Sequence, residues 1–130
     1  MWGLTHYGNP EDYMWDVHSG ISAGSINTAG LVGWEPEKTV EASEFLSNMW
    51  ASVENEDVYK DWVGSGKTGF MRSCLGYISC YDTSPALEWL SGTLGHFTEI
   101  KRRFSISAAD VASGEFVTFD QKNTKIEDVP

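Results

Sequence analysis

The sequence predicts an α/β fold, a sheet flanked by helices, because helical and strand-like patterns alternate along its 130 residues. Apolar side chains recur at helical spacing between residues 42 and 53, and they alternate with polar ones between residues 103 and 108. A third observation is Gly20-Ile21-Ser22-Ala23-Gly24, which follows a short apolar run. Its pattern, G-x-S-x-G, is typical of a sharp turn from a strand into a helix.

The N-terminal part of the chain predicts a helix, a strand and a second helix. Residues 1–6 have the character of the end of a helix, which the turn-forming Gly8-Asn9-Pro10 terminates. Residues 13–19 are expected to form the strand that leads into Ser22. Residues 25–32 continue as a helix whose small side chains allow close packing on the sheet.

The next helix is the most regular of the chain. Pro36 suits the first turn of a helix, and an apolar stripe follows at spacings of three and four residues. We expect this stripe to be core rather than a ligand site; its members are Ala42, Phe45, Leu46, Met49, Trp50 and Val53. Residues 57–62 have the character of a further short turn of helix.

The C-terminal part predicts one helix and a pair of strands. Ser84 is expected to cap a helix with Pro85 in its first position, and Gly92 or Gly95 ends it. The residues of this helix expected to face inward are Leu87, Leu90 and Leu94. Residues 103–108 alternate as a strand does, and residues 112–114 form a turn into a second strand at 116–119.

Composition and charge restrict the function. The formal charge of −10 excludes nucleic acid as a partner, because phosphate binding needs a basic surface. The three histidines are scattered, and Cys74 and Cys80 match no zinc or redox spacing, although one disulfide between them is compatible with the sequence. We therefore predict neither a metal nor another cofactor. No segment has the length and apolarity of a membrane span or the pattern of a signal peptide, and no compartment is predicted.

The glycine-rich stretch at residues 64–69 invites comparison with a phosphate-binding loop. The Walker pattern requires a glycine five positions before its Gly-Lys pair, and Asp61 occupies that place. An acidic side chain there would repel a phosphate group. We interpret the stretch as a plain loop.

Ser22 is the candidate nucleophile. The glycines around it allow a tight turn that would lift its hydroxyl clear of the sheet edge. The first N–H groups of the following helix are unpaired donors that could stabilise an oxyanion. The alternative is that the pattern is only a packing turn, because three fixed positions occur in many loops.

The segment from Tyr13 to Asn27 resembles the nucleophile segment of patatin-like phospholipases. That family has an apolar strand followed by G-x-S-A-G-A/S-x-N, and the matching positions include Ala23, Gly24 and Asn27. Three further stretches resemble the family more loosely: residues 81–87, 104–110 and 114–119. The resemblance therefore covers most of the chain.

The resemblance implies a three-layer patatin-like sheet related to the α/β-hydrolases, and a serine-dependent lipid acyl hydrolase. Ser22 would attack the ester carbonyl and form an acyl-enzyme, with an aspartate as base and a glycine-rich loop as oxyanion hole. The implied substrate is a lipid or phospholipid ester, with peripheral contact to a membrane.

Two elements of the family are missing. Only Met1 to Tyr7 stand where the glycine-rich loop would precede the first turn, and no Asp-Gly dipeptide occurs to supply the base. We therefore expect residues 1–130 to be the central fragment of a patatin-like domain, incomplete at both ends. Such a chain alone is expected to be nearly inactive.

Other interpretations stay open. The chain could be a non-catalytic lipid-binding or scaffold remnant of the same fold. An acyl-carrier acyltransferase is disfavoured because Ile21 stands where those enzymes carry a histidine. A substitute base is a further alternative: Asp82 and His96 follow Ser22 in the order used by α/β-hydrolases, and Asp110 lies at a strand end. We expect Asp110 instead to cap the turn before Gly114.

Overall fold

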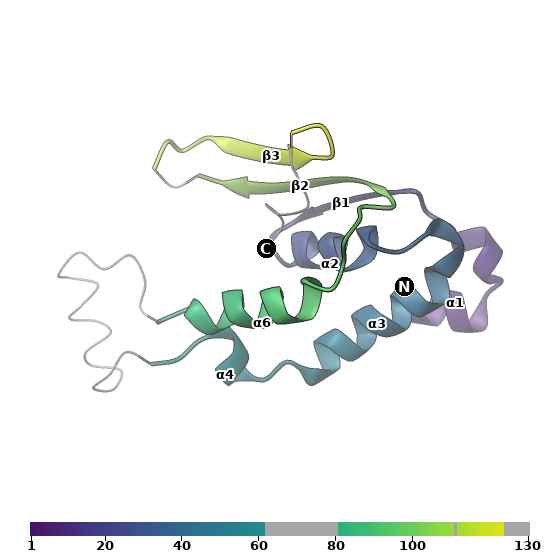
Figure 1. Ribbon diagram of the computed structural model, residues 1–130, viewed down its shortest axis with the longest axis horizontal. Coiled ribbons are helices and arrows are strands. Elements are labelled where there is room, and N and C mark those ends of the chain that lie inside the picture. The colour runs from purple at the N-terminus through teal and green to yellow at the C-terminus, as the bar shows by residue number, and fades with distance from the viewer. Residues whose placement is uncertain (62–80, 111, 124–130) are drawn as a thin grey trace.

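The computed structural model describes residues 1–61, 81–110 and 112–123. Helices and a three-stranded sheet alternate along them, so the chain is α/β as the sequence predicts (Figure 1). The elements are α1 (Trp2–Tyr7), the 3-10 turn η1 (Pro10–Tyr13), β1 (Val17–Ile21), α2 (Ala23–Val32), the 3-10 turn η2 (Pro36–Lys38), α3 (Thr39–Ser52), α4 (Asn55–Val58), α6 (Ser84–Leu94), β2 (Arg103–Ala109) and β3 (Phe116–Asp120).

The sheet has the order β1-β2-β3, with a parallel pair and an antiparallel pair. Val17 is opposite Arg103 in the parallel pair, and Ala109 is opposite Phe116 in the hairpin formed by β2 and β3. The ends of β1 and β2 and the start of β3 therefore lie at the same edge of the sheet. Ser22, which follows β1 directly, lies at this edge.

One face of the sheet packs on α2. A Cβ on Gly20 would point into the first turn of α2, so the residues that share its face, including the buried Phe104, are directed toward that helix. In Figure 1, α3 and α6 lie on the far side of α2 from the sheet. The described helices thus lie on one side of the sheet, and a helical layer on its other face remains a prediction.

The core lies where α2, α3 and α6 meet. A Cβ on Gly30 of α2 would lie 3.3 Å from a methyl of Leu46 and 3.9 Å from one of Leu94, so the three helices approach closely at this glycine. The buried apolar side chains are Leu31, Val32, Ala42, Met49, Leu94 and Phe104. The rings of Trp34, Phe45 and Phe97 extend this core, with centroids 5.6–5.9 Å apart.

The first strand is shorter and later than the predicted range 13–19. Asn9 and Pro10 begin a 3-10 turn, because the Asn9 side chain accepts a hydrogen bond from the amide of Glu11 and proline suits the first position. The strand starts at Val17 because its partner strand starts at Arg103, and the earlier apolar residues have no strand to pair with.

The other predicted elements are confirmed with small shifts. The helix at 84–94 begins at Ser84 itself, with Thr83 in the cap position, and Gly95 ends it. Leu87 and Trp50 are wrong as core residues, because they are 59% and 38% exposed. The short turn predicted at 57–62 corresponds to α4, which begins two residues and ends four residues earlier.

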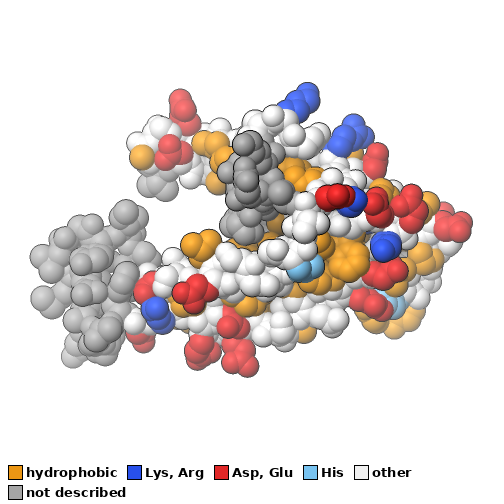
Figure 2. Space-filling view, in the orientation of Figure 1, with side chains coloured by type: hydrophobic (Ala, Val, Ile, Leu, Met, Phe, Trp, Pro, Cys, Tyr) orange, Lys and Arg blue, Asp and Glu red, His pale blue; other side chains and the backbone are white. Residues whose placement is uncertain are grey.

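Several predictions fall on residues that the structure does not describe. These are the two cysteines, the loop at 64–69 and the C-terminal residues 124–130. In the described parts of the chain, no helix is long and apolar enough to cross a membrane, and no group of three or more His, Cys, Asp or Glu side chains could hold a metal. Figure 2 shows acidic side chains spread over the visible face rather than gathered in one patch.

Candidate functional site

Ser22 occupies the turn between β1 and α2 in a strained backbone conformation. Its φ is 56° and its ψ is −127°, a combination that L side chains rarely adopt. Among the described residues it is the only non-glycine with a positive φ. A serine held in a strained strand-to-helix turn is the geometry of a nucleophile elbow.

Gly20 is the residue that lets the turn close. A Cβ at this position would lie 2.0 Å from the carbonyl oxygen of Gly24, far inside van der Waals contact. A Cβ on Gly24, in contrast, would meet nothing within 4 Å. The two glycines of the motif are therefore not equivalent, because only the first is required by the packing of the strand on the helix.

Ser25 braces the turn from the helix side. Its amide donates to the carbonyl of Ser22 at 2.8 Å, and its hydroxyl donates to the carbonyl of Gly20 at 3.1 Å. These two bonds join the last residues of the strand to the first turn of α2. They help to hold Ser22 in its strained conformation.

The hydroxyl of Ser22 is accessible. The residue is exposed, and its side chain makes no hydrogen bond to any described residue. The first N–H groups of a helix lack intrahelical acceptors, and those of Ala23 and Gly24 precede the amide of Ser25 in α2. An exposed hydroxyl beside two free amide donors is an arrangement that acyl transfer uses.

The structure does not join Asp82 and His96 to Ser22. The carboxylate of Asp82 accepts from the amide of Ser84 at 3.0 Å and lies 3.3 Å from Nζ of Lys60. The Ser84 hydrogen bonds, with Lys60 as a smaller contribution, lower the pKa of Asp82.

The imidazole of His96 packs against two phenylalanines, with ring centroids 5.5 Å from Phe45 and 4.1 Å from Phe97. No hydrogen bond within the described chain connects it to Asp82 or to Ser22. The geometry therefore gives the Ser–Asp–His alternative no support.

Asp110 lies at the same edge of the sheet as Ser22 but belongs to the hairpin turn. Its carboxylate accepts from the hydroxyl of Ser113 at 2.8 Å and from the amide of Ala112 at 2.9 Å, and its carbonyl accepts from the amide of Gly114. The bond from Ser113 is the main reason why the pKa of Asp110 is lowered. This is the turn-capping role that the sequence predicts.

Arg102 is a buried arginine that joins several segments of the chain, and no sequence pattern predicted this role. The residue is only 3% exposed, and it precedes β2 by one position. Its five N–H groups have five acceptors: the carbonyls of Trp34 (2.8 Å), Trp15 (3.0 Å) and Glu35 (2.8 Å), Oγ1 of Thr39 (3.4 Å) and Nε2 of His18 (3.1 Å).

This arrangement favours the neutral form of His18. A guanidinium can only donate, so Nε2 of His18 must be the acceptor and the proton of a neutral ring resides on Nδ1. Burial and the neighbouring charge of Arg102 lower the pKa of His18, against a smaller opposing effect of Asp16. His18 lies at the start of β1, four residues or about 13 Å along the strand from Ser22, and cannot act as its base.

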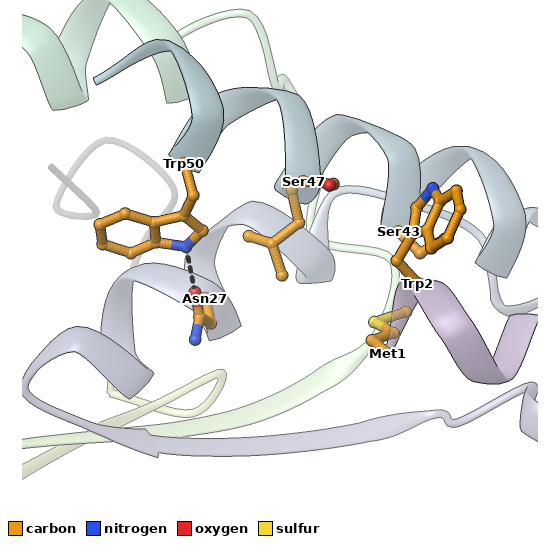
Figure 3. A pocket seen from close by; sticks show the side chains of 7 residues that line it. Met1, Trp2, Asn27, Ser43, Ser47 and Trp50 are labelled. Atoms are coloured by element: carbon orange, nitrogen blue, oxygen red, sulfur yellow. Dashed lines mark hydrogen bonds between the residues drawn. The ribbon is translucent and has the colours of Figure 1, made fainter. Parts of the chain in front are cut away.

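A shallow depression of about 220 Å³ lies between α1, α2 and α3 (Figure 3). Asn27 and Trp50 close one end of it, where the indole Nε1 donates to Oδ1 of Asn27 at 2.6 Å, and Met1 and Trp2 line the other end. Ser22 is not among its lining residues. This depression is therefore separate from the candidate nucleophile.

Comparison of the chain with models of known protein families, with curated proteins and with solved structures found no match.

Proposed function

We propose that this chain is part of a serine-dependent lipid acyl hydrolase of the patatin-like phospholipase type, with Ser22 as the nucleophile. The observation that carries the proposal is the backbone of Ser22, which has a φ of 56° at the junction of a parallel strand and a helix. Strain of this kind persists only where surrounding structure holds it, and it is concentrated at functional sites.

The chemistry follows from the position of the hydroxyl. Ser22 Oγ gives up its proton to a base and attacks the carbonyl carbon of an ester, while the amides of Ala23 and Gly24 donate to the developing oxyanion. The alcohol leaves with the proton, and water then hydrolyses the acyl-enzyme. On this proposal the base and the remaining oxyanion donors come from outside the described residues, as the family resemblance implies.

Apolar surface beside Ser22 supports a lipid as the substrate. Ile21 and Phe116 are 61% and 63% exposed, and the register directs both to the outer face of the sheet at the edge where Ser22 lies. In a patatin-like three-layer sheet a helical layer would cover most of this outer face, so the two side chains support contact with a lipid only at the edge beside Ser22. A patatin-like three-layer sheet would use this edge as the substrate entrance.

Sequencing the transcript on both sides of this segment tests the family assignment. The proposal expects a glycine-rich loop upstream and Asp-Gly-Gly or Asp-Gly-Ala downstream. The product of that transcript should then react with a fluorophosphonate probe, which labels activated serines. In the isolated 130-residue chain, labelling as fast as that of an intact lipase would contradict the need for an outside base.

Two serines of the same turn region provide the variant and its control. Ser22→Ala removes the proposed nucleophile and should abolish labelling and ester hydrolysis. Ser19→Ala changes an exposed serine of β1 whose hydroxyl makes no hydrogen bond to a described residue, and it should leave both unchanged. Labelling that survives Ser22→Ala would refute the proposal.

A second candidate is a non-catalytic lipid-binding or scaffold remnant of the same fold. It is favoured by one observation, that no described side chain hydrogen-bonds to the hydroxyl of Ser22. Phosphatidylcholine vesicles distinguish the two functions. A remnant would bind them without hydrolysing the ester, and Ser22→Ala would bind them equally well. A transcript without the two family segments, together with retained vesicle binding, would favour this candidate.

A further inference from the structure

The buried side chain of Arg102 joins the start of β1 to the end of α2. Together β1, Ser22 and α2 form one unit of strand, turn and helix. Arg102 donates to the carbonyl of Trp15, which precedes β1, and to the carbonyls of Trp34 and Glu35, which follow α2. The strand and the helix are joined at Ser22 at one end of the unit. At the other end they are joined through this guanidinium.

Backbone hydrogen bonds reinforce the same junction. The amides of Lys101 and Arg102 donate to the carbonyl of Val32, at 2.7 and 3.2 Å, and the amide of Arg103 donates to the carbonyl of Asp16 at 2.9 Å. The segment before β2 is therefore bonded both to the end of α2 and to the start of β1. The position of this segment therefore depends on the hydrogen bonds of the Arg102 guanidinium.

His18 is the titratable acceptor among the five partners of Arg102. The other four are three backbone carbonyls and a threonine hydroxyl, none of which ionises in the physiological range. A proton on Nε2 of His18 would replace the hydrogen bond with two like charges 3.1 Å apart. The protonated imidazole and the guanidinium cannot both keep their present positions.

Neighbouring carboxylates do not offset this repulsion fully. Asp16, beside the start of β1, favours the charged form of His18, but its carboxylate is paired with Arg103 at 3.3 Å. Glu35 and Glu37 of the η2 region favour the charge of Arg102, and Glu35 is itself 3.3 Å from Nζ of Lys101. The helix packed on β1, α2, contains no titratable side chain.

We propose that His18 and Arg102 form a pH-sensitive clamp. While His18 is neutral, Arg102 keeps the start of β1 joined to the end of α2, and these contacts are lost when His18 takes up a proton. The proposal does not depend on the function of Ser22. It goes beyond that function, because it concerns a conformational change at the opposite end of the unit.

The sign of the effect follows from the lowered pKa of His18. Below the ordinary histidine value of about 6.5 the unfolded chain binds a proton that the folded chain resists, so stability is full above that pH and falls as the pH decreases toward the pKa of the folded state. The ratio of folded to unfolded chain should drop by up to about tenfold for each pH unit in that window.

Amide hydrogen exchange between pH 7.5 and 5 tests the clamp where it acts. Protection factors of the Lys101 and Arg103 amides should fall toward pH 5 in the wild-type chain. His18→Gln supplies an amide oxygen that accepts from Arg102 and cannot be protonated, so its protection should stay constant. His96→Gln removes an exposed imidazole that does not touch Arg102, and this control should behave as the wild type does.

A proton NMR titration of the wild-type chain tests the same proposal without a variant. The His18 ring should titrate below 6.5, and the Arg102 side-chain resonances should shift with the same midpoint. A His18 ring that titrates at 6.5 or above would overturn the proposal. An equal loss of protection in the wild type and in His18→Gln would also overturn it.

Discussion

Gly20 and Gly24 lie so close together that a Cβ on Gly20 would be 2.0 Å from the carbonyl oxygen of Gly24, whereas a Cβ on Gly24 would meet nothing within 4 Å. The same motif therefore contains one glycine that the packing requires and one that it does not. The requirement arises because β1 crosses the first turn of α2 at van der Waals distance. This asymmetry can be measured.

Gly20→Ala and Gly24→Ala should change stability in opposite directions. The first forces strand and helix apart and should lower the free energy of unfolding by about 1–3 kcal/mol or more. The second places alanine in a helix with room for its methyl group, and should raise it by about 0.5–1 kcal/mol. Urea unfolding measures both, and equal losses in the two variants would contradict the geometry.

The strained backbone at Ser22 predicts that glycine is tolerated better than alanine at this position. Ser22→Gly should be more stable than Ser22→Ala by about 1–3 kcal/mol, because glycine adopts a φ of 56° and a ψ of −127° freely and alanine does not. Both variants lack the hydroxyl, so their difference reports the backbone alone. Thermal unfolding gives the comparison, and equal stability would mean that the turn relaxes without cost.

The existence of the elements could be predicted from the sequence, because periodicity and turn residues depend only on neighbours in the chain. The turn at Ser22 could be predicted for the same reason, since its glycines and its serine are adjacent. The start of β1 could not, because the apolar run before Val17 has strand character while Asn9 and Pro10 favour a 3-10 turn and β2 begins only at Arg103.

The hydrogen-bonding role of Arg102 could not be predicted from sequence patterns, for a different reason. Three of its five acceptors are backbone carbonyls, which every residue possesses, and they lie 67–87 positions away in the chain. A signal was nevertheless present. Lys101, Arg102 and Arg103 form a basic triplet in an acidic chain. The strand alternation directs Arg102 inward, where a guanidinium needs hydrogen-bond partners.

The two adjacent arginines should respond very differently to substitution. Arg102→Met removes a buried guanidinium, leaves its five acceptors without their donor and should cost about 3–5 kcal/mol of stability. Arg103→Met removes an exposed ion pair with Asp16 and should cost less than about 1 kcal/mol. Chemical denaturation at pH 7.5 compares them. A similar cost for both would show that Arg102 does not hold the junction.

Asp110 should prove to be a turn residue and not a base for Ser22. Its lowered pKa arises from Ser113 and Ala112, both in the hairpin turn, so the carboxylate form stabilises the folded state. That contribution is present above the ordinary aspartate value of about 3.9 and is lost as the pH falls through the lower pKa of the folded state. Asp110→Asn should therefore show a smaller loss of stability below pH 4 than the wild type.

Asp110→Asn also distinguishes a turn-capping role of Asp110 from a role as the base for Ser22. An asparagine at 110 keeps one acceptor oxygen for the turn but cannot take a proton from a serine. If the base for Ser22 lies outside the described residues, Asp110→Asn should leave the rate of fluorophosphonate labelling unchanged in the transcript's full product. A fall of a hundredfold or more, about the contribution of a general base, would instead identify Asp110 as that base and make its bonds to Ser113 and Ala112 a resting arrangement.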